Sequence, residues 1–228
     1  MTKPRPNIRR LTALLCALIT GLLGFTGAAN ATTAPLTTAA PSIGLAWFPT
    51  PNGSQGQCGG SGSTQWTAAP NWTNPILIDT DNRDGGCIMS LGVFDPGNAV
   101  PGLSIQYTWE YTGGSYPDQC QNLNTGYTQG TFSAPVGPTE NFGPAFLDDT
   151  DNRSGYCNLT FTVSGRTDVA LDIQFYPTPM AEAGQCRNVT SPGAYFSAST
   201  GSPVTIGLDT DGRGGGCELQ LRLEHIGF

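Results

Sequence analysis

The sequence predicts an all-β protein made of three repeats of about four strands each, stabilised by disulfide bonds. One pattern, Asp-Thr-Asp-(Asn/Gly)-Arg-x-Gly-x-Cys, occurs three times with identical spacing, as is typical of an internal repeat. We call its copies motif 1 (79–87), motif 2 (149–157) and motif 3 (209–217). The chain has 31 Gly and 18 Pro, and outside the N-terminal segment no window has a helical period of apolar residues.

The N-terminal segment predicts export. Residues 1–31 combine a basic start, an apolar run from Leu11 to Leu23 and the cleavage pattern Ala29-Asn30-Ala31, as a signal peptide does. The apolar run is too short for a membrane span, so we expect none. The protein is therefore expected to be secreted and extracellular.

Domain organisation follows from composition and from the repeat. Residues 32–41 are mostly Thr, Ala and Pro and are expected to be a flexible spacer. The remainder, 42–228, is expected to be one β domain, because the gaps between repeats are short. The three repeats are placed at about 42–98, 102–165 and 168–228.

The charge of the chain argues against one class of partner. Removal of residues 1–31 leaves six Arg and no Lys against seventeen Asp and Glu, a net charge of about −11. A protein this acidic repels phosphate backbones, so we expect no nucleic-acid partner.

Six cysteines remain after the signal peptide, two in each repeat. An even number in an exported protein implies disulfides, and no C-x-x-C pair or His cluster suggests zinc. Pairing within repeats is the simplest arrangement because each repeat has one Gln-Cys upstream and one motif Cys. The expected disulfides are Cys58–Cys87, Cys120–Cys157 and Cys186–Cys217.

Each repeat carries four strand signals in the same order. The first strand has apolar residues at every second position, as in Ile105, Tyr107 and Trp109. A Gly- and Pro-rich loop follows and ends at Gln-Cys. A short second strand and a third strand lead to the motif. These segments are 66–68, 132–134 and 196–198 for the second strand, and 76–78, 146–148 and 206–208 for the third.

The fourth strand begins at the motif Cys and alternates strictly, as in Cys157, Leu159, Phe161 and Val163. The Cys shares the apolar face, so each disulfide is expected to be buried. The motif is then expected to connect a β-hairpin of strands three and four. Twelve strands in three repeats suit a β-trefoil-like or a β-prism-like fold.

Three interpretations of the motif remain open. In the first, it is a turn in which the Arg pairs with one Asp and the other Asp accepts backbone N–H bonds. In the second, the carboxylates bind calcium, although the Arg would repel the ion and no bidentate Glu follows. No other cofactor is expected. The metal candidates are Asp79, Asp81, Asp149, Asp151, Asp209 and Asp211.

In the third interpretation the motif binds a ligand. Carboxylates, an Arg and backbone amides suit sugar hydroxyls, and an aromatic ring suits a pyranose face. Tyr156, where the other copies have Gly86 and Gly216, is the best candidate for an exposed ring. The candidate ligand-binding residues are Asp79, Asp81, Arg83, Asp149, Asp151, Arg153, Tyr156, Asp209, Asp211 and Arg213.

Catalysis has little support in the sequence. The single histidine, His225, lies near the C-terminus, and no Ser occurs in a G-x-S-x-G pattern. The overall plan resembles the threefold lectins in architecture, although the Q-x-W repeat of ricin-type trefoils is absent. We therefore expect a non-catalytic, lectin-like protein that binds an extracellular glycan or cell-wall polysaccharide. The alternatives are an enzyme inhibitor or protein-interaction scaffold with a secreted partner, and a calcium-stabilised structural protein.

Overall fold

The computed structural model describes most of the predicted β domain. The described residues are 39–51, 58, 62–79, 85–113, 120–122, 124–149, 155–184, 186–187, 195–209 and 214–225. They belong to one compact unit, 37–228. The predicted signal peptide and the motif centres 80–84, 150–154 and 210–213 lie outside them.

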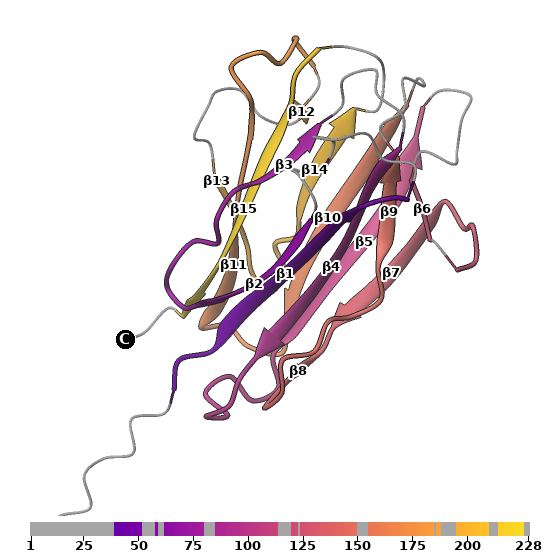
Figure 1. Ribbon diagram of the computed structural model, residues 1–228. Helices are drawn as coiled ribbons and strands as arrows, with labels where there is room; N and C mark the ends of the chain where they lie inside the picture. Colours follow the sequence, from indigo (N-terminus) through magenta and orange to yellow (C-terminus); the bar gives the residue numbers. More distant parts are fainter. Residues whose placement is uncertain are drawn as a thin grey trace, which may run out of the picture. The chain divides into compact units, whose positions relative to one another are not determined.

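The described residues form β-strands and no helix, and the strands make three antiparallel sheets (Figure 1). None of their segments is a helix long and apolar enough to cross a membrane. The first sheet has the order β2 (Ser63–Ala68), β1 (Ser42–Pro49), β4 (Gly86–Phe94), β9 (Phe146–Asp149) and β6 (Cys120–Asn122), with β8 (Val136–Gly137) parallel to β4.

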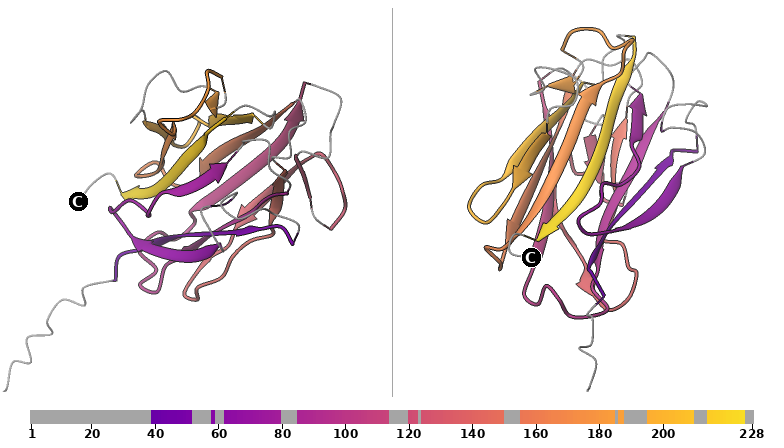
Figure 2. Two further views of the ribbon diagram at one scale, coloured as in Figure 1. Left: turned by 45° about the horizontal axis from the view of Figure 1, so that its top comes forward. Right: turned by 90° about the vertical axis from the view of Figure 1, so that its left-hand side faces the viewer.

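The second and third sheets repeat this order with other strands. The second is β12 (Cys186–Arg187), β14 (Val204–Asp209), β10 (Tyr156–Ser164), β5 (Ser104–Thr112) and β7 (Gln129–Ala134). The third is β13 (Tyr195–Ala198), β11 (Val169–Pro177), β15 (Gly216–His225) and β3 (Ile76–Asp79). Figure 2 shows β11 and β15 of the third sheet on the side away from β1 and β2.

All four strand signals of each repeat form strands, but the expected hairpin is wrong. The third strand pairs with the fourth strand of another repeat: β3 with β15, β9 with β4, and β14 with β10. Each motif therefore connects two different sheets. Alternation of side chains marks a strand and its buried face, but it carries no information about the partner strand.

The strand count also differs from twelve. Three short strands, β6, β8 and β12, form in segments expected to be loops. β6 and β12 begin at the upstream cysteines and pair with β9 and β14. In each sheet, the second, first and fourth strands of one repeat are joined by the third strand of another. The trefoil or prism arrangement stays a prediction.

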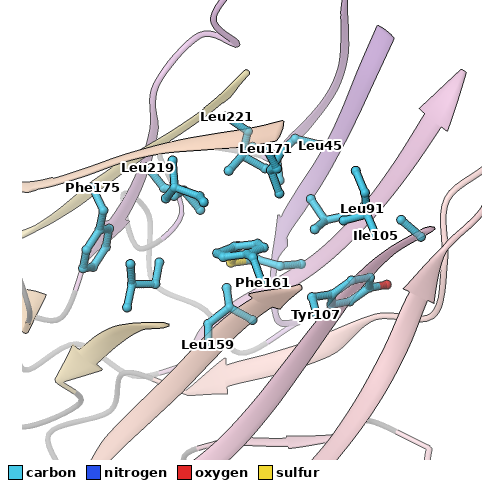
Figure 3. Close-up of a cluster of buried hydrophobic side chains, with 14 of the residues drawn as sticks. Leu45, Leu91, Ile105, Tyr107, Leu159, Phe161, Leu171, Phe175, Leu219 and Leu221 are labelled. Atoms are coloured by element: carbon cyan, nitrogen blue, oxygen red, sulfur yellow. The ribbon is translucent and has the colours of Figure 1, made fainter. Parts of the chain in front are cut away.

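One hydrophobic core is shared by the three sheets. The alternating residues of the first and fourth strands are buried, including Leu45 and Leu91 of the first sheet, Tyr107 and Phe161 of the second, and Leu221 of the third (Figure 3). The disulfide cysteines are buried in the same cluster, as the sequence predicts. Burial of so many apolar side chains is the main driving force for this fold.

Candidate functional site

The strand register brings the borders of the three motifs together at one end of the sheets. Asp149, which begins motif 2, is opposite Gly86 at the end of motif 1. Asp209, which begins motif 3, is opposite Tyr156 at the end of motif 2. Asp79, which begins motif 1, is opposite Gly216 at the end of motif 3. The three motifs are therefore linked in a closed cycle, border to border, and we call this region the motif end.

Hydrogen bonds from threonines fix the ends of the motifs. The Thr50 N–H donates to the Gly86 carbonyl over 2.9 Å, and the Gly86 N–H donates to Thr50 Oγ1 over 3.2 Å. Thr178 and Gly216 make the same two bonds, at 2.9 and 3.1 Å. The residue before the motif Cys is thus held at the start of the fourth strand by the residue that follows the first strand, because both backbone groups find partners.

The three disulfides lie directly below the motif end. They join Cys58 to Cys87, Cys120 to Cys157 and Cys186 to Cys217, the same pairs that the repeat predicts, with Cα–Cα distances of 5.6, 5.2 and 5.8 Å. Each motif is attached at its last residue to the upstream loop of its own repeat. This restricts the positions of both segments.

One buried carboxylate distinguishes motif 2 from the other copies. Asp148, which precedes motif 2, has no exposed surface and is opposite Cys87 and Cys120 in the first sheet. The equivalent residues, Ile78 and Leu208, are apolar and buried. A buried carboxylate in a β-sheet requires a polar or charged partner, so this position is chemically specialised in one repeat.

The positions of the predicted site residues are only partly described. The backbones of Asp79, Asp149 and Asp209 are the last residues of β3, β9 and β14, which end at the motif end, toward the top of Figure 1. Tyr156 begins β10. The remaining candidates, Asp81, Arg83, Asp151, Arg153, Asp211 and Arg213, lie outside the described residues. The structure thus brings the borders of the three motifs together.

Tyr156 differs from the expectation of an exposed ring, because it is half-buried. It lies on the outer face of the second sheet, in line with Asn158, Thr160 and Thr162 of the same strand. The aromatic residues of the first strands, such as Trp47 and Trp109, belong to the core. Alternation predicts this burial, since both rings share the inward face of their strands.

The residues exposed most strongly were not among the site candidates. Tyr127 is 70% exposed, Tyr195 62% and Met180 81%. Tyr195 lies on β13, beside a cluster on the outer face of the third sheet. Exposure of single residues is not encoded in a strand pattern, and a loop residue such as Met180 gives no sequence signal at all.

That outer-face cluster surrounds Arg222. Its guanidinium lies 4.7 Å from the centroid of the Trp72 ring and donates to Asp172 Oδ2 over 3.0 and 2.5 Å. A further bond of 3.0 Å reaches Glu224. Hydrogen bonding to Asp172 raises the pKa of Arg222, and Asp172 also raises the pKa of Glu224. The cluster fixes the segment before β3 against the third sheet, because Thr73 also bonds to Leu221.

A second ionic cluster lies at the other end of β11 and β15. Arg166 pairs with Asp168 through Nε and Nη2, and His225 Nε2 lies 3.1 Å from Asp168 Oδ2. The hydrogen bond from Arg166 holds the pKa of the Asp168 carboxyl well below its usual range. His225 therefore has an ionic partner, but no nucleophile adjoins it in the printed contacts.

No metal-ligating group is found in the part of the chain that the structure describes: it contains no cluster of three or more His, Cys, Asp or Glu residues. The calcium interpretation depends on Asp81, Asp151 and Asp211, which are outside it. The chain matches no protein-family model, no curated protein and no solved structure.

Proposed function

We propose that the protein is a secreted, non-catalytic, carbohydrate-binding protein whose three motifs provide related binding loops. The ligand is an extracellular glycan or a cell-wall polysaccharide. The observation that carries the proposal is the cyclic register of the motif borders: Asp149 opposite Gly86, Asp209 opposite Tyr156, and Asp79 opposite Gly216.

The register supports this function because it gathers three copies of one chemically rich loop at a single end. Each copy carries two Asp and one Arg within five residues. Carboxylates and guanidinium groups accept from and donate to sugar hydroxyls. Three weak sites at one end bind a repeating glycan more tightly than one site does, because the second and third contacts are intramolecular.

The same register supports a pseudo-threefold arrangement of the repeats. In each sheet the fourth strand in order is the third strand of a different repeat, and the exchange closes after three steps. A cyclic exchange of this kind is compatible with a β-prism, in which three sheets surround one axis. We propose the prism rather than the trefoil for this reason.

The arrangement favours binding over catalysis. A glycosidase needs two carboxyl groups with different roles at one bond, whereas the motif is present in three copies with the same acidic residues. Asp148 breaks this equality in one copy, but it is buried at the base of the motif end.

Thermal unfolding with added ligands tests the proposal. The protein from the full chain is heated with uncharged and charged polysaccharides, with calcium, and with EDTA. A rise in the midpoint with one glycan, without release of reducing ends, is expected because a ligand that binds only the folded state stabilises it. A rise with calcium alone, or with nothing, contradicts the proposal.

A second function is favoured by one observation. Met180 is 81% exposed on a loop that is held by hydrogen bonds from Ala181 to Thr178 and from Glu182 to Gly214. An exposed apolar residue on a restrained loop suits contact with a protein. A scaffold of this kind would lose its partner in Met180→Ser, whereas the glycan proposal predicts unchanged glycan binding in that variant.

A further inference from the structure

The outer face of the second sheet carries an ordered row of threonines. Thr131, Thr108, Thr160 and Thr205 are register partners on four adjacent strands, β7, β5, β10 and β14. Register partners have side chains on the same face, about 4.8 Å apart between strands. The four hydroxyl groups therefore form a line across the sheet.

Hydrogen bonds hold this row in place. Thr108 Oγ1 and Thr131 Oγ1 are 2.8 Å apart, as are Thr160 Oγ1 and Thr205 Oγ1. Threonine is β-branched and has few side-chain conformations in a strand. The row is therefore preorganised, and ordering it on binding costs little entropy.

The rest of this face is polar and almost uncharged. Gln106 and Thr162 lie on one side of the row, and Glu110 and Asn158 lie on the other. Among the outward side chains of the second sheet that the structure describes, Glu110 is the single charged one, although the whole chain has a net charge of −7. Thr131, Thr205 and Glu110 are exposed, and the others are half-buried.

The outer faces of the other two sheets are built differently. In the first sheet, Ser90 and Gly92 are buried, because the segment 141–143 and the Trp66 ring cover them. In the third sheet, Arg222 is paired with Asp172 beneath the Trp72 ring. The core positions of the three repeats are thus alike, while the outer positions of the second repeat form an open polar face.

The chemistry of this face points to an uncharged ligand with many hydroxyl groups. Hydroxyl and amide side chains both donate and accept, as sugar hydroxyls do. A nearly uncharged face offers no electrostatic complement to a charged polymer. The row crosses four strands and is flat rather than concave, so it matches a chain of sugars better than a single one.

Tyr156 links this face to the motif end. It lies on β10 four residues before Thr160, and successive outward residues of a strand are roughly 7 Å apart. Its ring offers apolar surface to a sugar, with a polar hydroxyl at the edge. A glycan bound at motif 2 would therefore continue along β10 onto the threonine row.

We propose that the outer face of the second sheet, from Tyr156 to Thr162 and across the threonine row, binds an extended uncharged polysaccharide. This inference rests on the proposed glycan-binding function and assigns the polysaccharide class to it. It also makes the second repeat unequal to the other two as a binding unit.

Adsorption to insoluble polysaccharides tests the inference. The protein from the full chain is mixed with cellulose, chitin and β-1,3-glucan, and with immobilised heparin as a charged comparison. Thr160→Lys and Thr131→Lys place long cations on the face, and Gln174→Lys places one on the outward side of the third sheet. Unfolding midpoints of all variants are measured first, and the exposed Thr131 site serves if Thr160→Lys fails to fold.

The expected result is binding to at least one uncharged polysaccharide, with an affinity about tenfold lower in both Thr variants, equivalent to about 1.4 kcal/mol. Gln174→Lys should match the wild type. Equal binding by all variants would overturn the inference and leave the proposed function standing. Absence of binding to any glycan would overturn both, and binding to heparin alone would contradict the uncharged ligand.

Discussion

Asp149, the first residue of motif 2, is the register partner of Gly86, the residue before the cysteine of motif 1. This single pairing shows that the motif does not close a hairpin within its repeat. It instead joins the third strand of one sheet to the fourth strand of another, while its cysteine is tied to its own repeat. The repeats are therefore interlocked, and the disulfides and the core are expected to stabilise them as one unit.

The disulfide between Cys120 and Cys157 closes a loop with a sequence separation of 37 residues. Replacing both cysteines by Ala should lower the free energy of unfolding by about 4 kcal/mol in the chain-entropy model. Urea unfolding measures this change. The denatured wild-type protein should show no reactive thiol from the six disulfide cysteines, and two or more would contradict the assignment.

Arg222 should be important for stability because its partner Asp172 is 1% exposed. Arg222→Ala leaves a buried carboxylate without its main cation and should destabilise the fold by roughly 2–4 kcal/mol. Glu224→Gln is the control, since Glu224 is 42% exposed and its pairing should contribute less than about 1 kcal/mol. Similar midpoints for the two variants in urea would contradict this account.

Gly92 should not tolerate a larger residue, because an added Cβ would overlap the Asn141 carbonyl and crowd the Trp66 ring. Gly92→Ala should lower the free energy of unfolding by about 1–3 kcal/mol through overpacking. Gly137→Ala is the matched control, since nothing lies within 4 Å of its added Cβ. An equal effect at both positions would show that the segment 141–143 does not cover the first sheet.

The pairing of Asp168 with Arg166 predicts a pH dependence at acidic pH. The pKa of Asp168 is lowered in the folded protein, so its stabilising contribution is present above the unfolded value of about 4 and is lost as the pH falls below it. Thermal midpoints of the wild type and Asp168→Asn should therefore converge on acidification below pH 4. A constant difference between them would contradict the pairing.

The strands and the core could be predicted from the sequence because burial in a sheet leaves a period of two. Leu159 and Phe161 are predicted and found in the core, and the motif cysteines are buried with them. The disulfide pairs could be predicted because each repeat contains two cysteines. Strand partners could not, since a third strand such as β9 has the same pattern whichever fourth strand it joins.

The candidate site was predictable in position but not in surroundings. The conserved spacing of the three motifs within this chain identifies Asp79, Asp149 and Asp209, and the register then places them at one end. The threonine row was not predictable, because Thr108 and Thr160 become neighbours only through pairing of β5 with β10. Such pairing joins residues that are far apart in the sequence.

The most direct test of the central claim is titration calorimetry of the protein with soluble oligosaccharides of the glycan that raises its unfolding midpoint. We predict saturable binding at three related sites, with loss of one site in each of Arg83→Ala, Arg153→Ala and Arg213→Ala while the variants remain folded. No heat of binding with any glycan, or full binding by all three folded variants, would contradict the claim that the motifs bind carbohydrate.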